Sequence, residues 1–302
     1  MDKIIRCITS DGAVMAAAVD ASDIVFTAQR LHKTTPVATA ALGRLLSAGS
    51  LMGVSLKQSK AKLNLQIKGD GPLGNIIVVA DSNGNVRGYV GNPDCPTEYY
   101  NNGKINVSAG VGKHGTLGVI RDYGTGEPYI GNVPLTSGEI AEDIAGYYAT
   151  SEQIPTVCAL GVLIDKEDSR VLLAGGLLIQ LLPGADDSTI EKLEKNISVL
   201  EPVTTMFAKG MSILDICKTA LQGFEVEVLD EEPVNYVCSC SRERIESYFA
   251  GLPEEELRAC MDENGGAQVK CEFCNKEYNF SNDDLEEIIS VRVQNQTDSE
   301  DE

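Results

Sequence analysis

Apolar and polar residues alternate along much of the first 184 residues, and this alternation is typical of antiparallel strands. Asp11-Gly12 lies between two short apolar runs near the N-terminus, which predicts a β-hairpin. Three later segments repeat one plan of strand, polar turn and strand. These segments are residues 76–89, 117–130 and 157–182.

Helical spacing interrupts the strand pattern at two places. Thr35-Pro36 has the residue types that begin a helix, and apolar residues then recur at helical spacing from Leu42 to Met52. A second helix is predicted over residues 137–150, with Ser137 as its N-cap. We therefore predict an α+β domain over residues 1–184, built from antiparallel strands with packed helices.

The pattern changes after residue 184. Residues 186–200 are predicted to form a polar, amphipathic helix with Ile190, Leu193 and Ile197 on one apolar stripe. A further helix over residues 203–221 and a short alternating strand at 225–228 follow. Residues 185–232 are thus interpreted as a mainly helical linker between two domains.

Residues 233–290 are predicted to form a small C-terminal domain, followed by an acidic tail at 291–302 that is expected to be disordered. Four of the nine cysteines lie in this domain as two close pairs, Cys238/Cys240 and Cys271/Cys274. Thiolates in such pairs are typical of a tetrahedral zinc site, and four of them leave no open position for catalysis. Cys260 lies between the pairs and is expected to pack as a small apolar residue.

Charge excludes some classes of function. The chain has 45 acidic and 25 basic residues, a net charge of −20, and residues 186–302 carry 28 of the acidic and 10 of the basic ones. An acidic surface repels phosphate, so no nucleic-acid partner is expected. No apolar run could span a bilayer, so no membrane partner is expected, and the N-terminus does not resemble a signal peptide. We expect a cytoplasmic protein, in which an odd number of cysteines is not a disulfide framework.

Residues typical of catalysis are scarce. His32 and His114 are the only histidines, and nothing in the sequence places a nucleophile beside either of them. Residues 69–74 match a G-x-G-x-x-G phosphate loop by letter, but they precede a predicted strand and Pro72 interrupts them. We interpret them as a turn and predict that the protein is not an enzyme.

The sequence resembles the heat shock protein 33 family, the redox-regulated bacterial chaperones, over nearly its whole length. Both cysteine pairs match the C-x-C and C-x-x-C pairs of that family. The remaining likeness rests on residues 35–36, 41–46, 68–73, 138–143, 147–148, 151–156, 174–176 and 180–184.

The resemblance implies a holdase chaperone that does not hydrolyse ATP. In the reduced form Cys238, Cys240, Cys271 and Cys274 would bind one Zn²⁺, and the protein would be inactive. Oxidation would form disulfides, release zinc, unfold the linker and expose surfaces for unfolding client proteins, and the active form would be a homodimer. Four cysteines allow three disulfide connectivities. The expected bridges are Cys238–Cys240 and Cys271–Cys274, because each pair is adjacent in sequence and the resemblance implies the same.

The linker is expected to hide the client-binding surface, to which Ile190, Leu193 and Ile197 would belong. Two other functions compete with this interpretation. A zinc-ribbon module that binds nucleic acid or a protein partner would need a basic face, yet residues 233–302 hold 17 acidic and 6 basic residues. A thiol oxidoreductase using Cys271 and Cys274 would need a thioredoxin-like setting, which the sequence pattern does not supply.

Overall fold

The computed structural model describes residues 1–290, and the predicted acidic tail at 291–302 lies outside them. The chain divides into two compact units, Met1–Val237 and a second unit that begins at Cys238. Among the described residues, no helix combines the length and the apolar character needed to cross a bilayer.

The first unit contains two five-stranded antiparallel sheets. One sheet has the strand order β10-β1-β2-β9-β8. The turn at Asp11-Gly12 joins β1 to β2, as the sequence predicts, and the 157–182 segment forms the β8–β9 hairpin. The strands are β1 (Lys3–Thr9), β2 (Val14–Asp20), β8 (Thr156–Ile164), β9 (Val171–Leu181) and β10 (Val226–Pro233).

The second sheet has the order β5-β4-β3-β6-β7, and all its neighbours are antiparallel. Its hairpins β4–β5 and β6–β7 correspond to the two remaining predicted segments. Residues 70–74 form a turn between β3 and β4, as expected for the glycine-rich segment. The strands are β3 (Lys62–Gly69), β4 (Asn75–Asp81), β5 (Val86–Val90), β6 (Gly115–Asp122) and β7 (Tyr129–Pro134).

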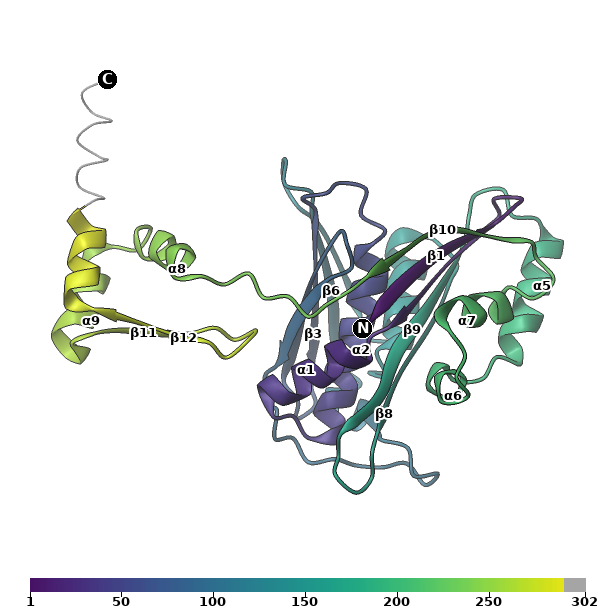
Figure 1. Cartoon of the computed structure of the whole chain (residues 1–302), viewed down its shortest axis with the longest axis horizontal. Coiled ribbons are helices and arrows are strands. Elements are labelled where there is room, and N and C mark those ends of the chain that lie inside the picture. The colour runs from purple at the N-terminus through teal and green to yellow at the C-terminus, as the bar shows by residue number, and fades with distance from the viewer. Residues whose placement is uncertain (291–302) are drawn as a thin grey trace. The chain divides into compact units, whose positions relative to one another are not determined.

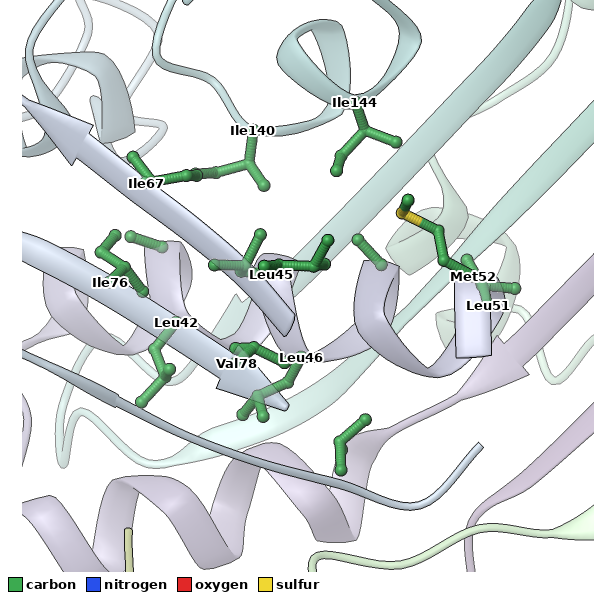
Figure 2. Close-up of a cluster of buried hydrophobic side chains, with 14 of the residues drawn as sticks. Leu42, Leu45, Leu46, Leu51, Met52, Ile67, Ile76, Val78, Ile140 and Ile144 are labelled. Carbon is green, nitrogen blue, oxygen red and sulfur yellow. The ribbon is translucent and has the colours of Figure 1, made fainter. Parts of the chain in front are cut away.

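Helices α1 (Ser22–His32) and α2 (Pro36–Gly53) lie between the two sheets (Figure 1). Of the 18 residues of α2, 16 are buried. Its leucines face residues of β3, β4 and the later helix α4 (Ala141–Tyr147), including Ile67, Ile76 and Ile144 (Figure 2). A Cβ atom at Gly53 would lie 2.5 Å from the backbone oxygen of Asp81, so close packing requires glycine there.

The helix predicted over residues 137–150 begins later than expected. After α3 (Val107–Val111), the next helix is α4 (Ala141–Tyr147), which continues as the π-helical turn η1 (Tyr148–Glu152). The carboxylate of Asp143 accepts backbone hydrogen bonds from residues 136, 137, 138 and 140 over 2.7–3.2 Å. These bonds fold the preceding residues into a loop, and Ser137 is not the N-cap.

Helices α5 (Asp187–Ser198), α6 (Val203–Ala208) and α7 (Ile213–Ala220) cover the face of the first sheet that points away from α2 (Figure 1). Strand β10 then pairs with β1 and extends the same sheet. Residues 234–237 continue along β5, where the amide of Val86 donates to the oxygen of Asn235 over 3.0 Å. The linker predicted over residues 185–232 therefore supplies three helices and an edge strand to the first unit.

The second unit is small. It contains α8 (Arg242–Phe249), α9 (Glu254–Asn264), the hairpin of β11 (Gly266–Lys270) and β12 (Glu277–Ser281), and a last helix over residues 282–290. Among the described residues, five buried side chains form its core, namely Leu257, Tyr278, Phe280, Leu285 and Ile289. The predicted fold class is confirmed: antiparallel sheets with packed helices, followed by a separate four-cysteine unit.

Candidate metal centre

The four paired cysteines come from two loops of the second unit. Cys238 and Cys240 lie in an extended segment that ends where Ser241 caps α8, its hydroxyl accepting from the Arg244 amide. Cys271 and Cys274 lie in the tight turn between β11 and β12. There the amides of Cys274 and Asn275 both donate to the Cys271 oxygen, and Asn275 has a φ of 59°. This reversal of the chain directs both sulfurs to the same side.

The four sulfur atoms lie within 4.8 Å of one another. Cys238 Sγ is 3.7 Å from Cys271 Sγ, and Cys240 Sγ is 3.4 Å from Cys274 Sγ. A tetrahedral zinc ion with Zn–S bonds of about 2.3 Å would hold its sulfurs about 3.8 Å apart. The donor type, donor number and spacing therefore fit a closed, four-thiolate metal site.

Tyr278 supports this cluster from strand β12. Its hydroxyl donates a hydrogen bond to Cys240 Sγ over 3.2 Å, and its ring is 7% exposed. Burial acts to raise the pKa of Cys240, but the hydrogen bonds from Tyr278 and the neighbouring thiols outweigh burial and lower the pKa to about 7. Burial raises the pKa of Cys238 and of Cys274. Cys240 thus ionises more readily than Cys238 and Cys274.

Arg242 holds the elements around the cluster together. Its guanidinium pairs with Asp284 over 2.7 Å and with Glu246 over 2.9 Å, and it donates to the Asn279 oxygen over 2.8 Å. The same group stacks on the Phe280 ring, 4.3 Å from its centroid. Sequence reasoning identified neither Arg242 nor Tyr278. Apart from Glu246, the partners of Arg242 lie more than 35 residues away, as does Cys240 from Tyr278, and only the fold brings them close.

The other cysteines lie apart from this cluster. Cys260 packs half-buried against the core of the second unit and is not among the four clustered sulfurs, while the remaining four belong to the first unit. The hairpin around Cys271 and Cys274 is a two-stranded antiparallel sheet rather than the β-α-β setting of a thioredoxin.

The apolar stripe of α5 belongs to the first unit. Leu193 is 5% exposed and packs with the face of the first sheet, Ile197 packs against the same cluster, and Ile190 is half-buried. The structure thus buries the central residue of the stripe between α5 and the first sheet.

Comparisons with known proteins agree over almost the full chain. The family model described as Hsp33 protein matches residues 2–281. A 33 kDa chaperonin of Clostridioides difficile is 47% identical over 95% of this chain and 98% of its own, and one of Acetivibrio thermocellus is 45% identical over 96% and 97%.

A solved structure leads to the same family. The crystal structure of the 33 kDa chaperonin, a heat shock protein 33 homologue, from Thermotoga maritima has a TM-score of 0.87 and 33% sequence identity, and the match covers 97% of this chain and 99% of that one. The family model, the relatives and the shared fold agree, and the chain belongs to the Hsp33 family of chaperones.

Proposed function

We propose that this chain is a redox-regulated holdase in which the four clustered thiols are the sensor. The observation that carries the proposal is the convergence of four sulfurs within 4.8 Å in a unit whose described residues contribute five buried side chains to its core. A core of this size stabilises little by itself. Structural zinc contributes about 10–16 kcal/mol in zinc-finger peptides. In the reduced form, one Zn²⁺ held by these thiolates would therefore keep the second unit folded.

Oxidation removes the ligands on which that fold depends. Each disulfide takes two electrons and two protons from a pair of thiols, so two peroxide molecules convert the four thiols and leave four waters. The proposed bridges are Cys238–Cys240 and Cys271–Cys274, each between cysteines adjacent in sequence. The short sulfur distances of 3.7 and 3.4 Å instead join one cysteine of each pair, as a shared metal would require. Bridge formation within the pairs would therefore follow loss of the metal and rearrangement of the loops.

The client surface proposed here is the apolar face under α5–α7. On the sheet side the covered residues include Ile5, Val14 and Ile179, and on the helix side Leu193, Met206 and Ile216, all of them buried. The chain runs from α7 through β10 directly into Cys238. When the second unit unfolds, residues 185–232 are therefore no longer followed by a folded unit. We propose that residues 185–232 then leave the sheet and that the exposed face binds unfolding proteins in a homodimer. In the cytoplasm this would protect clients during oxidative stress.

Aggregation of a heat-denatured model enzyme, followed by light scattering, tests the proposal. The reduced, zinc-loaded protein should leave aggregation unchanged, and the peroxide-treated protein should suppress it at near-equimolar ratio without ATP. Cys260→Ser serves as a matched control, since it changes a cysteine of the same unit outside the cluster. If both forms are equally inactive against aggregation, the proposed function is wrong. Disulfide-reductase activity in the same samples would favour the oxidoreductase interpretation instead.

A further inference from the structure

The segment that follows β10 covers the outer edge of the second sheet. In the part of the chain that the structure describes, β5 is the last strand on that side. Residues 234–237, here called the strap, run parallel to β5 and end directly before Cys238. The Val86 amide donates to the Asn235 oxygen over 3.0 Å, and the Val237 amide donates to the Val86 oxygen over 2.9 Å. The strap thus pairs with β5 as a short additional strand.

The side chain of Tyr236 extends this pairing by one further position. Its hydroxyl donates to the Gly88 oxygen over 2.9 Å and accepts from the Gly88 amide over 3.3 Å. One hydroxyl therefore meets both backbone groups that a paired strand would satisfy. Nε2 of His32 lies 3.3 Å from the same hydroxyl oxygen. The edge of β5 is thus closed partly by backbone and partly by a side chain that takes the place of backbone.

Two alternate side chains of the strap fill sites on the first unit. Val234 is 1% exposed, and a Cβ atom at Gly84 would lie 3.0 Å from its Cγ1 atom. Tyr236 packs half-buried against the core between the two sheets. Asn235 and Val237, the other two residues of the strap, are exposed. Peptides that add a strand to a sheet edge bind in this way, with affinity from main-chain hydrogen bonds and selectivity from alternate side chains.

The groups that receive the strap are held in place by the first unit itself. Val86 and Gly88 belong to β5, which pairs with β4 along its other edge. The side-chain oxygen of Asn85 accepts from the Asn235 amide over 3.0 Å. The side-chain amide of Asn85 donates to Asp81 over 3.1 Å, which fixes its orientation without help from the strap. If the strap leaves, these donors and acceptors face outward without partners, and such an edge pairs readily with another extended chain.

We propose that the edge of β5 is a docking site for extended segments of unfolding proteins, and that the strap occupies this site until the second unit unfolds. The strap carries no charged side chain, so the preferred segment is uncharged. It has a small aliphatic residue in the position of Val234 and a tyrosine two residues later. Because the strap leads directly into Cys238, loss of the folded second unit frees its C-terminal end.

This site differs in kind from the apolar face under α5–α7. It lies on the second sheet and offers mainly backbone donors and acceptors, which every unfolded chain can match. The two side-chain sites would add preference for some segments over others. The role of the docked segment as a client rests on the proposed function, whereas docking itself does not.

Fluorescence anisotropy with the full-length protein tests the site. The probe is a labelled synthetic peptide with the sequence of residues 232–237, and the comparison peptide carries the substitution Tyr236→Ala. The reduced, zinc-loaded protein should bind the probe at least about tenfold more weakly than the zinc-free protein, because the strap then occupies the edge. The zinc-free protein should bind the comparison peptide at least about tenfold more weakly than the probe, since an aromatic anchor is lost.

Variants of the strap separate its release from the loss of metal. The Tyr236→Ala protein loses both the ring and the hydroxyl, so it should bind the probe while still loaded with zinc. The Tyr236→Phe protein keeps the ring and should bind to an intermediate degree. Tyr99→Ala is the matched control, because Tyr99 is 58% exposed in the same unit, and this variant should bind as the unchanged protein does.

Hydrogen exchange, followed by NMR for single amides, locates the bound probe. The amides of Val86 and Gly88 should exchange at least about tenfold faster after zinc removal and become protected again when the probe is added. Unchanged protection of both amides after the second unit has unfolded would overturn the proposal, as would equal binding of the two peptides.

Two further outcomes separate the docking site from other interpretations. A Tyr236→Ala protein that binds no probe and elutes as a dimer would assign the edge to a second copy of the chain and would also overturn the proposal. Probe binding at the edge by a protein that does not suppress aggregation would support the docking site and reject the proposed function alone.

Discussion

The hydroxyl of Tyr278 donates a hydrogen bond to the sulfur of Cys240 over 3.2 Å, from a ring that is almost fully buried. Such outer contacts orient a metal ligand and stabilise its ionised form. We expect Tyr278→Phe to weaken zinc binding by about 10- to 100-fold, since loss of such a partner has that effect in other metal sites. Competition with a chromophoric chelator at pH 7 measures the affinity. Tyr248→Phe is the control, because Tyr248 is 63% exposed in the same unit, and equal affinities for the two variants would contradict the assigned role.

Metal removal should unfold the second unit and leave the first unit folded. With a core of five buried side chains among its described residues, the second unit should lose its fold when a strong chelator removes metal from the four thiols, whereas the first unit has extensive cores of its own. Hydrogen exchange with mass spectrometry should show full exchange in residues 238–270 and retained protection in β3 and β4. Cys271→Ser should behave like the chelated protein, and Cys260→Ser like the metal-bound one. Persistent protection of α9 and β11 after chelation would show that the metal is dispensable for the fold.

Charge on the covered face of α5 should loosen the helices from the sheet. Leu193→Asp places a carboxylate where a side chain is 5% exposed, which costs about 2–4 kcal/mol of docking free energy. We expect this variant to suppress aggregation partly while still reduced, and to be cut faster by protease between α5 and β10. Val199→Asp is the matched control at a position that is 77% exposed. A folded Leu193→Asp protein that is as inactive as the control would exclude masking by α5.

Asp2 should give the first unit a pH-dependent stability. Burial, with help from Asp20 and Asp23, raises its pKa to about 6 despite backbone hydrogen bonds from Asp23 and Ile24. The folded pKa of Asp2 therefore exceeds its unfolded value. Between about pH 4 and pH 6 the folded state keeps a proton that the unfolded state has released. The free energy of unfolding therefore falls as the pH rises through this range. A shift of this size corresponds to about 2–3 kcal/mol.

The comparison with Asp2→Asn isolates that group from the other carboxyls. From pH 7 to pH 4, the free energy of unfolding of the unchanged protein should rise by about 2–3 kcal/mol relative to the variant. Urea denaturation at several pH values, monitored by the first unit's circular dichroism, supplies the difference. Parallel stability curves for the two proteins would show that the carboxyl of Asp2 ionises as it does in the unfolded chain.

The sequence pattern predicted those elements that depend on interactions between residues close together in the chain. The turn at Asp11-Gly12, the helix that begins at Pro36 and the two cysteine pairs all depend on residues close in sequence, and the structure contains each element. Helix 137–150 was misplaced because one side chain, Asp143, binds four amides before the helix begins. Its short polar side chain competes with helix formation in a way that helical periodicity does not reveal.

The sequence pattern did not predict contacts between residues that lie far apart in the chain. Nothing in the local pattern pairs Lys3 with Pro233 or directs the hydroxyl of Tyr278 to Cys240. Each contact depends on sheet order or on the docking of a helix, which are set by the whole apolar core rather than by neighbouring residues. The four clustered cysteines could be found from their spacing alone, while Tyr278 and Arg242 beside them could not.

The pairing of β1 with β10 also bears on how the chain is made. More than 200 residues separate Thr9 from Val226, its partner across the two strands. At about 5–20 residues per second, a ribosome needs roughly 10–40 s to add that stretch. Throughout this interval the backbone of β1 lacks its outer neighbour, and the first sheet reaches its full width only near the end of translation. Completion of the first sheet is therefore one of the last events in synthesis, and it comes just before the ribosome adds the four clustered cysteines of the second unit.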